Sequence, residues 1–272
     1  MSTLTTTPDR AVVVAPRPRR EVRPIPTSRI IRVELRKMFN TRSGFWLLTS
    51  IGVLSVVATG AVIIFAPESD VTYETFASAI GFPMSVILPV IAILAVTSEW
   101  SQRSGLTTFT LVPSRGRVVG AKAVAILVVG IVSMLVAFAI GAVGNVVGSA
   151  LAGVDTVWNI GLADAPQIVL GNLVGMAIGF TLGVVLRNSA AAIVGYFVVS
   201  LVLPGILVLL AQVREWFTDL QPWIDWNTSQ VALFAGQTST AREWAQLGST
   251  TMIWIVIPLV VGLVLLRRSE VK

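Results

Sequence analysis

The stretch AVAILVVGIVSMLVAFAIGAVGNVV, residues 123–147, decides the fold class of this chain. It contains no charged side chain, and it is longer than the roughly 20 apolar residues that a helix needs to cross the hydrocarbon core of a bilayer. The stretch therefore predicts a membrane-spanning helix.

Working outward from this run, five further runs have a similar length and composition. They are residues 44–66, 76–96, 168–186, 190–211 and 250–266. A buried helix of a soluble protein is an alternative for one run of about 10 to 14 residues, but not for six runs of this length. A transmembrane β-barrel would need alternating segments of about 10 residues instead. The pattern predicts an all-α integral membrane protein with six transmembrane helices.

The composition of the whole chain agrees with this fold class. Hydrophobic residues make up 54% of the 272 residues and charged residues 12%, and the mean hydropathy is +0.83. A soluble domain has about 25% charged residues, so an ordinary soluble enzyme and a disordered regulator are both excluded. The chain has no Cys and no His, which removes thiolate sites, the commonest metal ligand and the commonest general base. The sequence predicts no catalytic, cofactor-binding or metal-binding residue.

The basic residues predict the orientation of the six spans. With six spans both termini lie on one side, and 18 of the 20 Lys and Arg residues fall on that side. The other side keeps Arg214 and Arg242. It also carries nine acidic residues: Glu68, Asp70, Glu74, Asp155, Asp164, Glu215, Asp219, Asp225 and Glu243. Because Lys and Arg concentrate in cytoplasmic loops, both termini are predicted to be cytoplasmic. The net charge of +6 therefore indicates membrane orientation, and nucleic acid is not an expected partner.

The segments outside the spans differ in character. Residues 1–26 are rich in Thr, Pro and Arg and predict a disordered basic tail, and residues 269–272 form a short second tail. Residues 27–43 predict an amphipathic helix in the cytoplasmic interface, followed by the six-span domain at 44–268. Its apolar face is predicted at Ile31, Leu35 and Met38, with Ile30 and Phe39 beside them. Its basic side is predicted at Arg29, Arg32, Arg36 and Lys37. A plain juxtamembrane basic stretch is the alternative.

The fourth span carries glycines at every fourth position, namely Gly171, Gly175, Gly179 and Gly183. Such a ridge allows another helix to approach closely. Packing within the chain and a subunit interface both remain open for this ridge. The spans carry no ionisable residue in their middle, which weakens an ion-coupled carrier as a function.

The segment TSEWSQRSGLTTFTLVPSRGRVVGAK, residues 97–122, joins the second and third spans. Glu99 and Arg103 have the spacing of a helical ion pair. Apolar side chains at Leu106 and Phe109, beside Thr107, would then face the cytoplasm. Exposed apolar groups rimmed by charge predict a docking surface for a cytoplasmic partner.

Two segments carry a resemblance to a known family. The segment RKMFNTRSGFWLL, residues 36–48, precedes six spans, and the segment from Glu99 to Lys122 joins spans two and three. Together they resemble the permease subunits of type-2 ATP-binding-cassette (ABC) exporters, particularly the short bacterial ones, over residues 29–268. The match is most specific at residues 99–122 and moderate at 34–46.

The resemblance implies a function that the residues alone do not. It implies a translocation path formed with a second permease subunit, identical or not, in the bacterial plasma membrane. It also implies that a cytoplasmic ATPase docks on a coupling helix within residues 99–110. Residues 27–40 would correspond to the family's elbow helix, with Arg32, Glu34, Leu35, Arg36 and Lys37 in it. The expected coupling residues are Glu99, Arg103, Leu106, Thr107, Phe109, Arg115 and Arg117.

ATP and magnesium are expected in the partner ATPase, because this chain has no G-x4-G-K-[ST] loop. None of its lysines, Lys37, Lys122 and Lys272, follows such a glycine pattern. Membrane lipid is the other expected partner. The leading alternative is a non-transporting membrane scaffold or immunity protein. An ion-coupled carrier and a membrane enzyme rank below it.

Overall fold

The computed structural model describes residues 25–101, 115–161, 163–234 and 240–268. These residues form helices joined by short connections, and no β-strand occurs among them. Most of the predicted disordered tail and the predicted tail 269–272 lie outside the described residues, as does the connection 102–114.

Six helical stretches are long and apolar enough to cross a membrane, which confirms the six predicted spans. They are α2, α3, α5, α6, α7 continued by α8, and α11 continued by α12. The helices are α1 (Thr27–Asn40), α2 (Arg42–Phe65), α3 (Tyr73–Ser101), α5 (Arg115–Ala152), α6 (Ala165–Leu186), α7 (Ser189–Phe197), α8 (Leu203–Val213), α9 (Glu215–Ile224), α10 (Trp226–Phe234), α11 (Ala241–Thr251) and α12 (Ile257–Arg268). A short 3-10 turn, η1 (Glu68–Asp70), follows α2. The π-helical segments η2 (Val198–Val202) and η3 (Met252–Val256) link α7 to α8 and α11 to α12.

The ends of the spans differ from the predicted ends where polar residues extend a helix. The sixth span was predicted at 250–266, but its helix begins at Ala241. Thr240 caps it, since its hydroxyl accepts from the backbone N–H of Glu243 at 3.3 Å and its own N–H donates to the Glu243 carboxylate at 2.6 Å. This capping box satisfies backbone groups that the apolar run does not reach. Hydropathy locates the apolar part of a span, whereas the cap decides where the helix starts.

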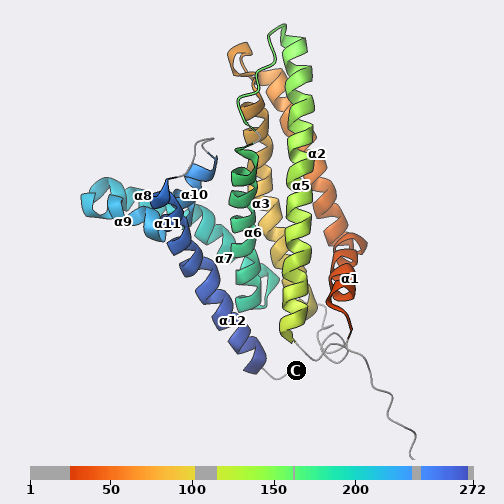
Figure 1. The fold of residues 1–272 in the computed structure, drawn as a ribbon, viewed down its shortest axis with the longest axis vertical. Helices are drawn as coiled ribbons and strands as arrows, with labels where there is room; N and C mark the ends of the chain where they lie inside the picture. Colours follow the sequence, from red (N-terminus) through yellow and green to blue (C-terminus); the bar gives the residue numbers. More distant parts are fainter. Residues whose placement is uncertain (1–24, 102–114, 162, 235–239, 269–272) are drawn as a thin grey trace, which may run out of the picture.

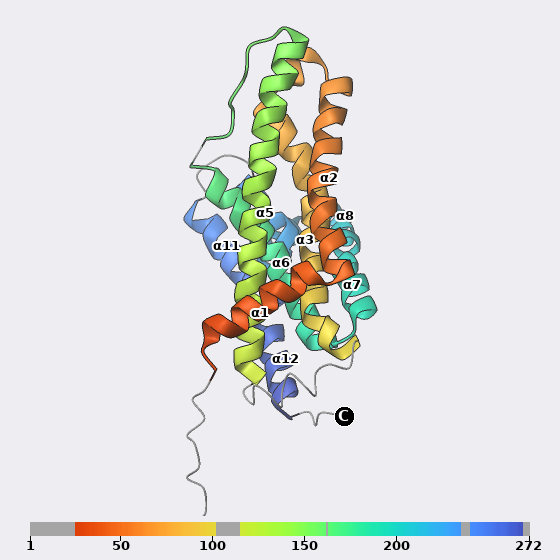
Figure 2. The same ribbon diagram turned by 90° about the vertical axis from the view of Figure 1, so that its right-hand side faces the viewer.

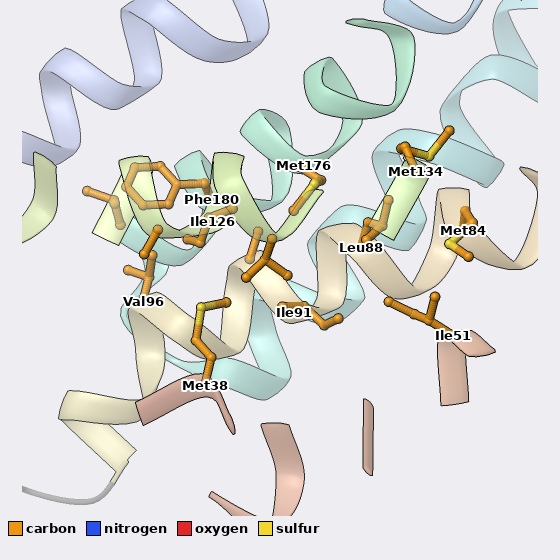
Figure 3. Close-up of a cluster of buried hydrophobic side chains, with 14 of the residues drawn as sticks. Met38, Ile51, Met84, Leu88, Ile91, Val96, Ile126, Met134, Met176 and Phe180 are labelled. Atoms are coloured by element: carbon orange, nitrogen blue, oxygen red, sulfur yellow. The ribbon is translucent and has the colours of Figure 1, made fainter. Parts of the chain in front are cut away.

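α3 lies at the centre of the bundle and packs against α2, α5, α6 and α7. Figure 3 shows its side chains Met84, Leu88 and Ile91 in the main core with Met134 of α5 and Met176 of α6. In Figure 1 the helices α8 to α11 lie to one side of the long helices, and the upper part of α5 rises beyond them. We call the end that holds α1, the end of α3 and the start of α5 the basal end.

The glycines of α6 lie against helices of the same chain. A Cβ added at Gly179 would come within 2.7 Å of the Pro89 carbonyl oxygen of α3, so only glycine allows this approach. Gly175 also faces Pro89, and Gly183 faces Ile93 and Val96 of α3. Gly171 instead lies under the ring of Phe234 in α10. The close approach that the ridge predicts is therefore made to α3 and α10.

Two prolines inside spans free a backbone carbonyl, and a side chain of another helix bonds each one. Pro89 cannot donate to the carbonyl of Ser85, four residues earlier. The hydroxyl of Tyr196 in α7 donates to this oxygen at 2.9 Å. Likewise Pro204 frees the carbonyl of Ser200 inside η2, and Asn227 of α10 donates its amide N–H to it at 2.9 Å. Neighbouring helices thus supply the donors that lipid cannot supply.

Candidate functional site

α1 lies across the basal end, where it packs against α5 and α2 (Figure 2). Its buried residues are Ile30, Glu34 and Met38, which repeat every four positions. Ile30 and Met38 of the predicted apolar side are buried, and Leu35 packs against the main core. Ile31 and Leu35 are only half-buried, because a carboxylate takes the middle of the buried face.

That carboxylate belongs to a group of four charges that we call the basal charge cluster. Its members are Glu34 and Lys37 of α1, Glu99 of α3 and Lys122 of α5. Lys122 Nζ lies 2.5 Å from Glu34 Oε2 and 3.2 Å from Glu99 Oε1. Lys37 Nζ lies 2.7 Å from Glu34 Oε1 and 3.4 Å from Glu99 Oε1. Each lysine therefore contacts both glutamates, and one cluster joins three helices.

The cluster is largely removed from solvent, which makes its pairing necessary. Glu34, Glu99 and Lys122 are 5%, 4% and 3% exposed, whereas the side chain of Lys37 is 43% exposed. An unpaired charge at such a depth costs several kcal/mol, but here two positive and two negative groups balance. Lys122 Nζ also donates to the Ala95 carbonyl at 3.1 Å, so that its remaining hydrogen-bonding capacity is used.

The charges act on one another's protonation. Burial by itself would raise the pKa of Glu34, but Lys122 and then Lys37 outweigh it and hold this pKa below its usual value. Burial would lower the pKa of Lys37, but Glu34 and Glu99 outweigh it and raise this pKa above its usual value. Both groups are therefore charged at neutral pH.

Arg117 makes a second link between α5 and α1. Its guanidinium donates to the Ile25 carbonyl at 2.7 Å and to the Thr27 hydroxyl at 3.2 Å. The start of α5 thus holds the start of α1, while Lys122 holds its middle. α1 therefore contacts α5 at two positions, near its own start and near its middle, and α5 begins where the connection 102–114 ends.

The corner between α1 and α2 is tight. The Thr41 hydroxyl caps α2 by accepting from the backbone N–H of Gly44 at 3.2 Å. A Cβ at Gly44 would collide with the Met38 carbonyl, so a larger residue would change the angle between the helices. The corner therefore fixes the angle between α1 and the first span.

The remaining residues predicted for the docking loop are not all described. Arg103, Leu106, Thr107 and Phe109 lie outside the described residues, and the predicted pair of Glu99 with Arg103 lies there too. Arg115 begins α5, but its side chain is also outside the described part. In the amphipathic helix, Arg32 and Arg36 are exposed and Leu35 is half-buried.

Lys122 is the member of the cluster that the sequence analysis did not select as a site residue. Two signals could have identified it. It is one of three lysines in the chain and stands directly before the apolar run 123–147. Glu34 has a four-residue spacing to both Ile30 and Met38, which places a carboxylate on an apolar helix face. A buried acid and a buried base of this kind predict a pair.

Comparison with known proteins adds a family to this geometry. The model of a family described as "ABC-2 family transporter protein" matches residues 29–271. No curated protein matches the chain. The family match covers nearly all of the described residues, including α1 from Arg29 onward, the basal charge cluster and the six spans. The chain therefore belongs to the ABC-2 family of transporter proteins.

Proposed function

We propose that this chain is the permease subunit of an ATP-driven exporter, and that a separate cytoplasmic ATPase docks on the connection 102–114. Family membership supports the permease role. ABC-2 permeases generally work with a cytoplasmic ATPase, which supports the docking partner. Export is the direction that the sequence resemblance implies. ATP and magnesium belong to the partner ATPase in this proposal, and a second permease subunit completes the path.

The basal charge cluster is the observation that carries the coupling part of the proposal. Glu99 and Lys122 stand on the two sides of the connection 102–114 and pair with each other. Each also pairs with one α1 side chain, Glu99 with Lys37 and Lys122 with Glu34. A displacement of the connection would therefore move α1, the end of α3 and the start of α5 together. The tight corner at Gly44 would pass this movement into α2. The cluster acts as a mechanical link and not as a catalytic group.

Docking is tested by co-purification. The chain is co-expressed with each ATP-binding-cassette ATPase of its host, and one ATPase is expected to co-purify with the wild-type chain. Phe109→Asp is expected to abolish this co-purification while leaving membrane insertion intact. Phe65→Asp is the matched control, because Phe65 is an exposed aromatic residue at the other end of the bundle. Failure of every ATPase to co-purify would favour the scaffold or immunity protein instead.

Orientation is tested with single cysteines, which the chain allows because it has no native Cys. Ser69→Cys lies in the exposed η1 turn at the end opposite to α1, and Ser269→Cys lies in the C-terminal tail. A membrane-impermeant maleimide is expected to label Ser69→Cys in intact cells. It should label Ser269→Cys only after the cells are permeabilised. The reverse pattern would contradict a cytoplasmic basal end.

The coupling role of the cluster is tested in the complex with the ATPase. The labelling rate of Ser69→Cys is measured without nucleotide and in an ATP-trapped state. We expect the two rates to differ in an otherwise wild-type chain and to become equal when Glu34→Gln and Lys122→Gln are added. This double substitution removes one negative and one positive charge, so it leaves the net charge unchanged. Unequal rates in that variant would remove the cluster from the coupling route.

A further inference from the structure

A groove opens at the basal end between α1, α2 and α5, on the side of the bundle that α1 crosses in Figure 2. Its volume is about 340 Å³. The lining side chains are apolar apart from Ser133. The lining residues are Leu35, Phe39, Leu48, Ile51, Gly52, Val128, Val129, Val132, Ser133 and Val136. Such a lining fits a hydrocarbon chain.

The groove runs along the spans. Its α5 lining extends from Val128 to Val136, a rise of about 12 Å at about 1.5 Å per residue. Half of the hydrocarbon core of a bilayer is about 15 Å thick. The groove therefore has the length of an acyl chain within one leaflet, with α1 at its lower end.

α1 adds positive charge beside the groove. At about 3.6 residues per turn, Leu35, Phe39, Arg32 and Arg36 follow one another within an arc of about 100°. Leu35 and Phe39 line the groove, and both arginines are exposed. Neither arginine takes part in an ion pair within the described part of the chain. An apolar groove next to two free guanidinium groups is complementary to a lipid with an anionic headgroup.

We propose that this groove binds one acyl chain of an anionic phospholipid, whose phosphate headgroup pairs with Arg32 and Arg36. The occupant comes from the leaflet that faces the basal end. A lipid bound there would fill the angle between α1 and the spans and hold α1 against them. This site is independent of transport and of any ATPase.

The structure offers a matched pair of substitutions for the acyl-chain part. A Cβ at Gly52 meets nothing within 4 Å, and the same is true of Gly60, two turns further along α2. Gly52→Leu would therefore fill the groove without disturbing the packing, whereas Gly60→Leu adds the same side chain outside it. For the headgroup part, Arg32→Gln with Arg36→Gln is matched by Arg242→Gln with Arg268→Gln. The control pair removes two exposed charges from other helices.

The test uses the full chain in nanodiscs with equal amounts of phosphatidylglycerol and phosphatidylcholine that have the same acyl chains. Lipid retained after detergent extraction is measured by native mass spectrometry. The wild-type chain is expected to retain phosphatidylglycerol preferentially. Arg32→Gln with Arg36→Gln should weaken this preference about fivefold per arginine, and the control pair should keep it. Gly52→Leu should lose the retained lipid, and Gly60→Leu should keep it.

Four results would overturn the proposal. Equal retention of the two lipids by the wild-type chain would mean binding of any lipid or detergent chain. Equal behaviour of the two arginine pairs would remove the headgroup contact. Retained lipid in Gly52→Leu would place the lipid elsewhere, and a loss of dimer mass in that variant would make the groove a contact with a second copy.

Discussion

The pair of helices α3 and α6 is built differently from the last two spans. In α6, 56% of the most apolar stretch is buried within the protein, and in α3 the share is 44%. In the fifth and sixth spans the shares are 6% and 17%. The first pair is held by glycine contacts, and α3 also supplies Glu99 to the basal charge cluster. The last two spans are interrupted by η2 and η3 and present apolar side chains outward.

This difference separates a fixed part of the molecule from a part with free apolar faces. Close backbone contacts and buried ion pairs have few alternative arrangements, because a small shift already costs packing. A span with an exposed apolar face can contact lipid or another subunit with little change in the protein itself. We therefore expect substitutions in the first part to change stability strongly, and matched substitutions in the last two spans to change it little.

Lys122→Met is expected to have the largest effect. It leaves Glu34 and Glu99 buried with only the half-exposed Lys37 as partner. Loss of one partner of a buried ion pair costs about 3–5 kcal/mol in the free energy of unfolding. Thermal unfolding in detergent, followed by tryptophan fluorescence, measures this loss. Lys272→Met, in the tail, is the control, and a loss below about 1 kcal/mol for Lys122→Met would contradict a buried cluster.

Gly179→Ala is expected to have the second-largest effect on stability. It directly compares the packing of α6 with that of the last two spans. Its Cβ would press on the Pro89 carbonyl and separate α6 from α3, at a cost of about 1–3 kcal/mol. Gly205→Ala in α8 is the same substitution where nothing lies within 4 Å. It is expected to be neutral or to stabilise by up to about 1 kcal/mol, since Ala favours a helix. Similar losses in both variants would mean that the last two spans are as tightly packed as α6.

Much of the fold could be predicted from the sequence, because hydropathy responds to the same transfer of apolar groups into lipid that forms the spans. The run 123–147 and its five counterparts show this. Contacts between particular residues of different helices could not be predicted in this way. Neither Lys122 nor Glu34 alone indicates what it contacts, since they are 88 residues apart and meet only through tertiary packing. Hydrophobic periodicity predicted the apolar side of α1, including Ile30 and Met38, but it did not predict that Glu34 is buried between them.

The π-helical segments could be predicted only in part from the sequence. Pro204 and Pro258 were visible inside predicted spans, and proline interrupts the helical hydrogen bonding. Each lies two residues after a π-helical segment. Pro89 has no such segment, although it also frees a carbonyl. The proline is visible in the sequence, but it does not decide whether the helix bulges, because Pro89 and Pro204 both have a neighbouring donor and only Pro204 follows a π-helical segment.

Tyr196→Phe tests such a donor and is expected to have a moderate effect. It leaves the Ser85 carbonyl of α3 without the hydrogen bond from the fifth span. Interhelical hydrogen bonds within membranes are worth about 0.6–2 kcal/mol, so a loss of this size is expected. Pro89→Ala returns an N–H donor to the same carbonyl. Tyr196→Phe should therefore cost less in a Pro89→Ala background than in the wild-type chain. Equal costs in both backgrounds would show that the hydrogen bond contributes nothing.

A change of pH is expected to have the smallest effect on stability, except at the acidic and alkaline extremes. This effect arises from the basal charge cluster. The pKa of Glu34 lies below its usual value of 4.5 in the folded chain, so its stabilisation is complete above pH 4.5 and is lost as the pH falls through the lower, folded pKa. The pKa of Lys37 lies above its usual value of 10.5, so its stabilisation is complete below pH 10.5 and is lost as the pH rises through the higher, folded pKa.

The melting temperature should therefore stay nearly constant between these limits and fall on either side of them. Glu34→Gln is expected to flatten the acidic fall and Lys37→Gln the alkaline fall, whereas Glu68→Gln in the exposed η1 turn should change neither. If the acidic fall keeps its full size in Glu34→Gln, then carboxylates elsewhere determine it. The cluster would then not distinguish the fixed part of the molecule from the last two spans.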